Sequence, residues 1–103
     1  MSNIFTLKTE NDLNRIIKAQ KKSGSKVNIL FHSLWDTSSA KLLEDLSKYS
    51  KNTPLYLVDS FTMPHAFIIF KTNKVPHLIT LGKFSLSSVD YLPIVYKSLG
   101  LFT

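Results

Sequence analysis

Two short apolar runs, joined by a helical pattern, most constrain how this chain can fold. The runs are Val27–Phe31 and Leu55–Val58, and neither alternates with polar residues as a strand with one wet face would. The apolar residues between them follow helical spacing: Leu42, Leu43, Leu46 and Tyr49. Two apolar strands joined through a helix form a right-handed βαβ unit, in which the strands lie parallel in one sheet. The pattern therefore predicts an α/β domain with an at least partly parallel sheet.

Local signals place the elements of the N-terminal half. Ile4–Leu7 is a short apolar-rich strand candidate, and Thr9 with Asp12 three residues later resembles a helix-opening capping box. The helix that starts there is expected to end at Gly24. The polar run 36–39 contains good N-cap residue types, so a second helix is predicted over about 37–50.

Proline and glycine residues mark the expected helix starts and turns of the C-terminal half. Pro64 suits the first turn of a short helix over 66–70. Leu78–Leu81 and Phe84–Leu86 are predicted to form a hairpin, with Gly82 first in a two-residue turn. A closing helix is expected from Ser87 or Ser88 to Leu99, and Pro93 either lies in a first turn that begins later, near Asp90, or kinks the helix.

Composition bounds the class of protein. The chain has 103 residues, 44% of them apolar, which suits one domain spanning 1–103 with its own core. It has no cysteine, so disulfides, thiolate nucleophiles and the usual zinc sites are absent, and its three histidines lack metal-binding spacing. No metal or cofactor is expected. No signal peptide or membrane-spanning run is evident, so a cytoplasmic protein is expected, in the host cytoplasm if phage-encoded.

The net charge of +6 favours encounters with acidic partners. All but one of the cations are lysine, whereas recognition of base edges favours arginine. No basic run alternates with aromatic residues, so nucleic-acid binding through the lysines is an alternative but not the favoured interpretation. The richness in Lys, Asn, Ser and Ile would suit an AT-rich phage or bacterial genome.

The order of elements and two local segments resemble the thioredoxin family. The run Ile29–Trp35 followed by Asp36–Ser39 is similar to the thioredoxin strand that ends in Trp-Cys-Gly-Pro-Cys at the start of a helix. The tripeptide Val75-Pro76-His77 is similar to the segment whose proline is cis in that family. The resemblance implies a thioredoxin-like three-layer sandwich, with a central mixed sheet of four to five strands and about four helices.

The departures from the family bear on function. The resemblance places the two redox cysteines at Asp36 and Ser39, neither of which can form a mixed disulfide. The family's buried aspartate falls on Leu30, and the proline that bends its second helix falls on Glu44. The chain is therefore expected not to be an oxidoreductase and to act as a redox-inactive module.

A peptide-binding groove is what remains of the family's site. Trp35 is expected at its rim, and the Val75 backbone is expected to pair with an extended peptide. Lys71 and Lys74 are expected to guide an acidic protein or peptide partner. The candidate binding residues are Trp35, Asp36, Ser39, Lys74, Val75, Pro76 and His77. An alternative is a non-redox enzyme in which Ser39 works with His32 or His77.

Overall fold

The two apolar runs form the central strands of the sheet. The structure is a computed structural model and describes residues 3–101. The predicted domain covers 1–103, so two of its residues at each end lie outside the described part. Strand β2 (Val27–His32) is buried along its whole length and pairs in parallel with β3 (Leu55–Asp59). Helix α2 (Thr37–Asp45) connects them, so the predicted parallel unit is confirmed.

Within residues 3–101, the sheet is mixed and has five strands in the order β1-β3-β2-β4-β5. Strand β1 (Ile4–Thr6) lies parallel to β3, whereas β4 (His77–Leu81) runs antiparallel to β2, and β5 (Leu86–Val89) antiparallel to β4. The carboxyl ends of β2, β3 and β5 and the amino end of β4 therefore meet at one edge. We call this end, where the connecting loops leave the strands, the loop end of the sheet. Residues 33–36, 60–63, 70–76 and 90–91 lie there.

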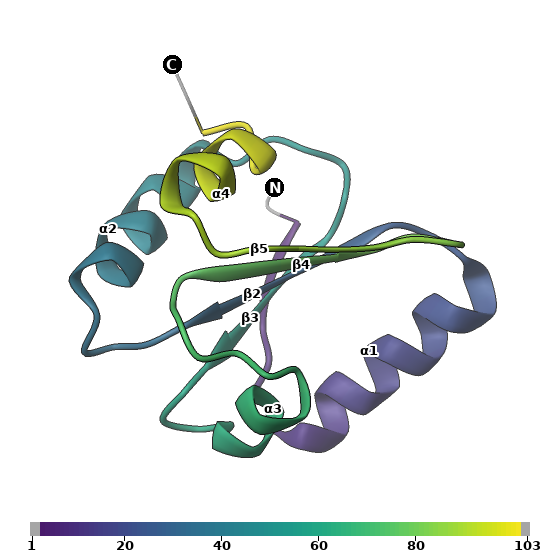
Figure 1. Cartoon of the computed structure of the whole chain (residues 1–103). Helices are drawn as coiled ribbons and strands as arrows, with labels where there is room; N and C mark the ends of the chain where they lie inside the picture. Colours follow the sequence, from purple (N-terminus) through teal and green to yellow (C-terminus); the bar gives the residue numbers. More distant parts are fainter. Residues whose placement is uncertain (1–2, 102–103) are drawn as a thin grey trace.

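Helices cover both faces of the sheet (Figure 1). Helices α1 (Glu10–Ser23) and α3 (Pro64–Ile69) lie on one side. Helices α2 and α4 (Leu92–Ser98) lie on the other, and α2 continues into a 3₁₀ turn, η1 (Leu46–Lys48). The predicted fold class, a three-layer α/β sandwich with about four helices, is confirmed, since the described part of the chain has four α-helices.

The alternation of side chains along β2 divides the core into two clusters. Leu30 packs with residues of α2 and α4, including Leu42 and Val95. Ile29 and Phe31 point to the opposite face and pack with residues of α1 and α3. Both faces of β2 are therefore covered, which explains why its sequence is a nearly continuous apolar run.

The capping signals of α1 act as predicted. The Thr9 hydroxyl accepts a hydrogen bond from the backbone N–H of Asp12 at 3.1 Å, and the Asp12 carboxylate accepts one from the Thr9 N–H at 3.2 Å. Gly24 ends the helix in the left-handed region, with φ of 72°, and donates its N–H to the Gln20 carbonyl. Both ends are thus fixed by local interactions that a short sequence window contains.

The hairpin turn is longer than predicted. Leu81 pairs with Leu86, so residues 82–85 form a four-residue loop in which the Gly82 N–H donates to the Ser85 carbonyl at 2.9 Å. The prediction of a two-residue turn was wrong because it counted Phe84 as a strand residue. Phe84 instead lies in the loop and is 93% exposed.

The closing helix begins later than Ser87. Ser87 and Ser88 belong to β5, where they pair with Thr80 and Ile79. Helix α4 starts at Leu92 with Pro93 in its first turn, which is the first of the two predicted alternatives. The second predicted helix is also shorter than 37–50, because α2 ends at Asp45 and η1 at Lys48.

The capping box yields a prediction about stability. Thr9→Ala removes the acceptor for the Asp12 N–H and should lower the free energy of unfolding by about 1 kcal/mol, as measured by urea denaturation. Thr9→Ser keeps the hydroxyl and serves as the control, with stability close to that of the wild type. Equal stability of Thr9→Ala and the wild type would show that the box does not stabilise α1.

Candidate binding site

The loop after β2 presents the tryptophan. Trp35 is 87% exposed, although it is the chain's single tryptophan and has a large apolar surface. The loop around it is closed by short-range bonds: the Trp35 N–H donates to the Ser33 hydroxyl, and the Asp36 N–H donates to the Ser33 carbonyl. These hydrogen bonds constrain the backbone of the loop from which the indole extends into solvent.

Asp36 caps helix α2. Its carboxylate accepts a hydrogen bond from the Ser39 N–H at 2.8 Å, and its carbonyl accepts one from the Ala40 N–H. A carboxylate at this point also meets the positive end of the helix dipole. The Ser39 hydroxyl is fully buried and accepts a hydrogen bond from the Ser33 N–H at 3.3 Å. The two positions that the resemblance assigns to cysteines therefore hold the loop to the helix.

The segment before β4 lies at the same end of the sheet. Phe31 pairs with His77, so the chain leaves β2 beside the point where it enters β4. The Val75–Pro76 peptide bond is cis. Pro76 is buried and Val75 half-buried, while Lys74 is exposed. Among residues 3–101, no hydrogen bond is formed by the Val75 backbone, so it remains free to pair with an added strand.

The predicted site residues divide into an accessible and a buried group. Trp35 and Lys74 are exposed, and Asp36 and Val75 are partly exposed. Ser39, Pro76 and His77 are buried, and the His77 Nε2 atom is hydrogen-bonded to the Ser88 hydroxyl. These buried residues shape the site but offer no side-chain surface to a partner.

Sequence reasoning missed three further apolar side chains at the loop end. Leu34 precedes Trp35, Phe61 follows β3, and Tyr91 follows β5; all three are exposed. Together with Trp35 they form what we call the rim, defined as Leu34, Trp35, Phe61 and Tyr91. The sequence alone gave no distinct signal for them, because single exposed apolar side chains are common on protein surfaces. It is the strand order that brings these three residues to the same end of the sheet.

A buried polar pair lies at the end of β2 and β3. His32 and Asp59 are cross-strand neighbours, and the histidine Nδ1 and the carboxylate Oδ1 are 3.9 Å apart. The second carboxylate oxygen accepts hydrogen bonds from the backbone N–H groups of Phe61 and Thr62. Burial lowers the pKa of His32, and the nearby Asp59 carboxylate opposes this shift only in part. His32 is therefore held neutral at neutral pH.

This pair lines a pocket of about 440 Å³. Leu7 and Leu34 supply apolar wall, and Lys8 and Thr62 are also part of its lining. Because Leu34 belongs both to the rim and to this pocket, the two features are continuous. We call it the His32 pocket.

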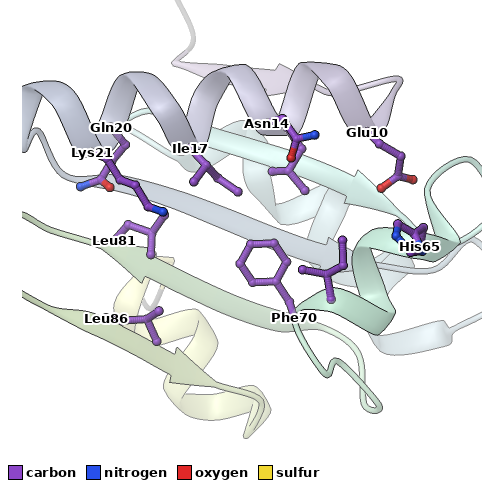
Figure 2. Close-up of a pocket in the computed structure, with 11 residues that line it drawn as sticks. Glu10, Asn14, Ile17, Gln20, Lys21, His65, Phe70, Leu81 and Leu86 are labelled. Carbon is purple, nitrogen blue, oxygen red and sulfur yellow. The ribbon is translucent and has the colours of Figure 1, made fainter.

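A second hollow lies between α1, α3 and the β4–β5 hairpin (Figure 2). Its volume is about 460 Å³, and most of its lining is apolar: Leu13, Ile17, Ile69, Phe70, Leu81 and Leu86. Figure 2 shows Lys21 near Leu81 at one end and Glu10 near His65 at the other. It contains none of the predicted site residues.

Metal binding and membrane insertion gain no support from residues 3–101. Within that range, no group of three or more His, Asp or Glu side chains is placed to hold a metal ion. No helix of the described part is long and apolar enough to cross a membrane.

Comparison with solved structures finds thioredoxins that match over nearly the whole chain. The reduced thioredoxin preprotein of Schistosoma mansoni has a TM-score of 0.73 at 18% identity, covering 99% of this chain and 100% of that one. Thioredoxin O2 of Arabidopsis thaliana has a TM-score of 0.71 at 20% identity, covering 95% of each chain. Mitochondrial thioredoxin 3 of Saccharomyces cerevisiae has a TM-score of 0.71 at 14% identity, covering 98% and 100%.

The chain therefore has a thioredoxin-like fold, as the resemblance implied. Comparisons with models of protein families and with curated protein sequences gave no match. The chain contains no cysteine, and dithiol–disulfide exchange requires two. This protein thus combines the fold of a thioredoxin with a loop end that cannot perform thioredoxin chemistry.

The cap at Asp36 can be tested by its effect on stability. Asp36→Ala removes the acceptor for the Ser39 N–H and should lower the free energy of unfolding by about 0.5–2 kcal/mol in chemical denaturation. Asp36→Asn preserves an acceptor oxygen and should lose less. If both variants match the wild type, Asp36 does not cap α2.

Two buried histidines predict how stability depends on pH. Burial lowers the pKa of both His32 and His77 from 6.5, so below that pH the unfolded chain binds more protons than the folded one. The free energy of unfolding should therefore fall as the pH drops from about 7.5 to about 5.5. The lowered carboxyl pKa values of Asp12 and Asp45 start from 3.8 and act only at more acidic pH.

Denaturant unfolding across this pH range measures the effect. His77→Gln should reduce the slope because only one of the two buried histidines then remains. A free energy of unfolding that stays constant, or rises toward acid, would contradict the assignment.

Proposed function

We propose that this protein is a redox-inactive, thioredoxin-like module that binds a protein or peptide partner through the loop end of its sheet. The observation that carries the proposal is the rim. Its four large apolar side chains are exposed on loops that the strand order brings to the loop end of the sheet. Exposed apolar residues concentrated at one place are typical of interaction sites, and Trp and Tyr are frequent anchors there.

The backbone of Val75, directly before Pro76, is available to pair with a partner peptide in extended conformation. The Val75 N–H and C=O have no hydrogen-bond partner within residues 3–101, and Val75 lies two residues before His77, which pairs with Phe31 near the end of β2, where the loop that carries Trp35 begins. A peptide strand added at Val75 would gain main-chain hydrogen bonds, while its side chains would contact the rim. The backbone would supply affinity and the rim would supply selectivity.

Charge favours an acidic partner. Lys71 and Lys74 are exposed in the segment before β4, and the chain carries a net charge of +6. Lysines at the margin of an interface raise the association rate more than the final affinity. We therefore expect an acidic peptide segment and a binding rate that falls with added salt. Such a module would suit an accessory subunit of a larger complex in the cytoplasm.

The geometry gives less support to an enzyme built on Ser39. Its hydroxyl is fully buried and is already the acceptor for the Ser33 N–H. His77 uses its Nε2 atom on Ser88, and no hydrogen bond links either His32 or His77 to Ser39 within the described residues. A nucleophile needs both access to substrate and a base within hydrogen-bond reach.

Trp35 itself provides the test of the proposal. Peptides selected from a random library on the immobilised protein should shift the emission of this single tryptophan to shorter wavelength and protect it from acrylamide. Trp35→Ala should weaken binding of the selected peptides by 2 kcal/mol or more, about thirtyfold, because a central aromatic anchor is lost.

Phe84→Ala is the matched control, since it removes an even more exposed aromatic side chain from the opposite end of the sheet. It should leave peptide affinity unchanged. Peptides that bind Trp35→Ala as tightly as the wild type would overturn the proposal. A ligand whose binding depends on Lys18, Lys21 and Lys22 of α1 and falls steeply with salt would instead support nucleic-acid binding.

A further inference from the structure

We propose that the apolar hollow between α1, α3 and the β4–β5 hairpin binds a free aliphatic carboxylate, such as a medium-chain fatty acid. The hydrocarbon chain lies on the apolar walls, and the carboxylate lies at Lys21. This site is separate from the proposed function, because the hollow shares no residue with the rim. We call it the α1 hollow. Three observations carry the inference: its size and length, its exposed apolar walls, and an unpaired cation at one end.

The α1 hollow is long and of the size of a small-molecule site. Its volume of about 460 Å³ falls in the range of roughly 300–1,000 Å³ that such sites occupy. Its wall on α1 extends from Glu10 to Lys21, along one face of the helix. At a rise of about 1.5 Å per residue, this wall is about 16 Å long. The shape therefore suits an extended ligand better than a compact one.

The walls expose aliphatic side chains that nothing in the described chain covers. Ile69 of α3 is 60% exposed and Leu86 of β5 is 65% exposed, and both line the hollow. Ile17, Phe70 and Leu81 also line it and are half-buried. A hydrocarbon chain laid between these side chains would remove apolar surface from water on both partners, which is the main source of affinity in such sites.

The lining favours a chain without polar groups over a peptide. The buried Gln20 amide donates to the carbonyl oxygens of Ser25 and Gly82, at 3.3 and 3.0 Å, so its two N–H donors are already used. A peptide would bring an N–H and a C=O at every residue, and apolar walls offer no partners for them. A hydrocarbon chain has no such groups and loses no hydrogen bonds on entering.

Charge selects the head group. Figure 2 shows Lys21 extending toward Leu81 at one end of the hollow. Lys21 is exposed and forms no ion pair within residues 3–101. Its ammonium group is therefore free to donate to a carboxylate, in a charge-assisted hydrogen bond. Glu10 lies at the opposite end, in the first turn of α1, where the helix dipole favours its negative charge. The net charge of +6 also disfavours a cationic ligand.

Three probes test the site on the wild-type protein. Decanoate, added to methyl-labelled protein, should give saturable NMR shifts at Leu13, Ile17 and Leu81, with no change in the emission of Trp35. Hexanoate has the same head group but four fewer methylene groups, so it should bind at least about tenfold more weakly. n-Decylammonium has a chain of the same length and the opposite charge, and it should bind more weakly than decanoate.

A lysine pair tests the head-group contact. Lys21→Gln should weaken decanoate binding about threefold to fivefold, the effect expected from the loss of one exposed ion pair. Lys22→Gln is the matched control, because it removes the same charge from the next residue of α1, which does not line the hollow. It should leave the affinity within about twofold of the wild type.

An isoleucine pair tests the apolar wall. Ile69→Ser should weaken decanoate binding at least about fivefold, because the chain loses an apolar contact. Ile68→Ser is the matched control: Ile68 is 72% exposed on the same helix but does not line the hollow. Amide spectra verify folding. If Ile69→Ser does not fold, Leu86→Ser replaces it, with Phe84→Ser of the same hairpin as its control.

Four results would overturn the site: equal affinity for hexanoate and decanoate, tighter binding of n-decylammonium, decanoate shifts centred on the rim, or no saturable shift at all. Protein that sediments with anionic phospholipid vesicles but gives no shift with decanoate would assign the surface to a membrane, which also overturns the proposal. None of these results affects the proposed function, which depends on Trp35. Conversely, selected peptides that ignore Trp35 would reject the peptide-binding role and leave the carboxylate site intact.

Discussion

The pairing of β2 with its two neighbours is the constraint on which the rest of this structure depends. β2 lies between β3 and β4, buried on both faces, with Leu30 and Phe31 pointing into opposite cores. Because β3 and β4 pair directly with β2, the register of these pairs sets where their loops lie at the loop end. A slip of one residue would turn each side chain to the other face, so the registers that pair His32 with Asp59 and Phe31 with His77 are tightly specified.

The start of α2 shows what replaces the redox centre in this fold. The positive end of a helix dipole stabilises a thiolate in the mechanism that the resemblance implies. Here the same end is occupied by the Asp36 carboxylate, which accepts the Ser39 N–H. The helix terminus therefore stabilises a structural cap, and the neighbouring loop carries the exposed Trp35. The same helix dipole that favours a thiolate in the thioredoxin mechanism here favours the Asp36 cap.

Local chemistry made much of this fold predictable from the sequence. The capping box of Thr9 and Asp12 involves residues three apart, and the apolar run of β2 reports burial directly. The hairpin was harder, because the choice between a two-residue and a four-residue loop depends on whether Leu81 pairs with Leu86 across the sheet. That pairing is a tertiary property, and the Gly82-Lys83 dipeptide alone suggested the wrong turn.

The candidate site was predictable only in part, for a similar reason. Trp35 and Val75 could be singled out from the resemblance, whereas the burial of Ser39 depends on the packing of α2 against the sheet. The His32–Asp59 pair was also missed. Its signal was present, since each residue is polar and directly follows an apolar run, and parallel strands bring such positions together.

The central claim, that partners bind at the loop end, is tested most directly by mapping a selected peptide onto the labelled protein by NMR. The account predicts that the largest shifts fall on residues 33–36, 60–63, 74–76 and 90–91, with small shifts elsewhere. Shifts centred on the hollow between α1, α3 and the β4–β5 hairpin, which shares no residue with the rim, would contradict it.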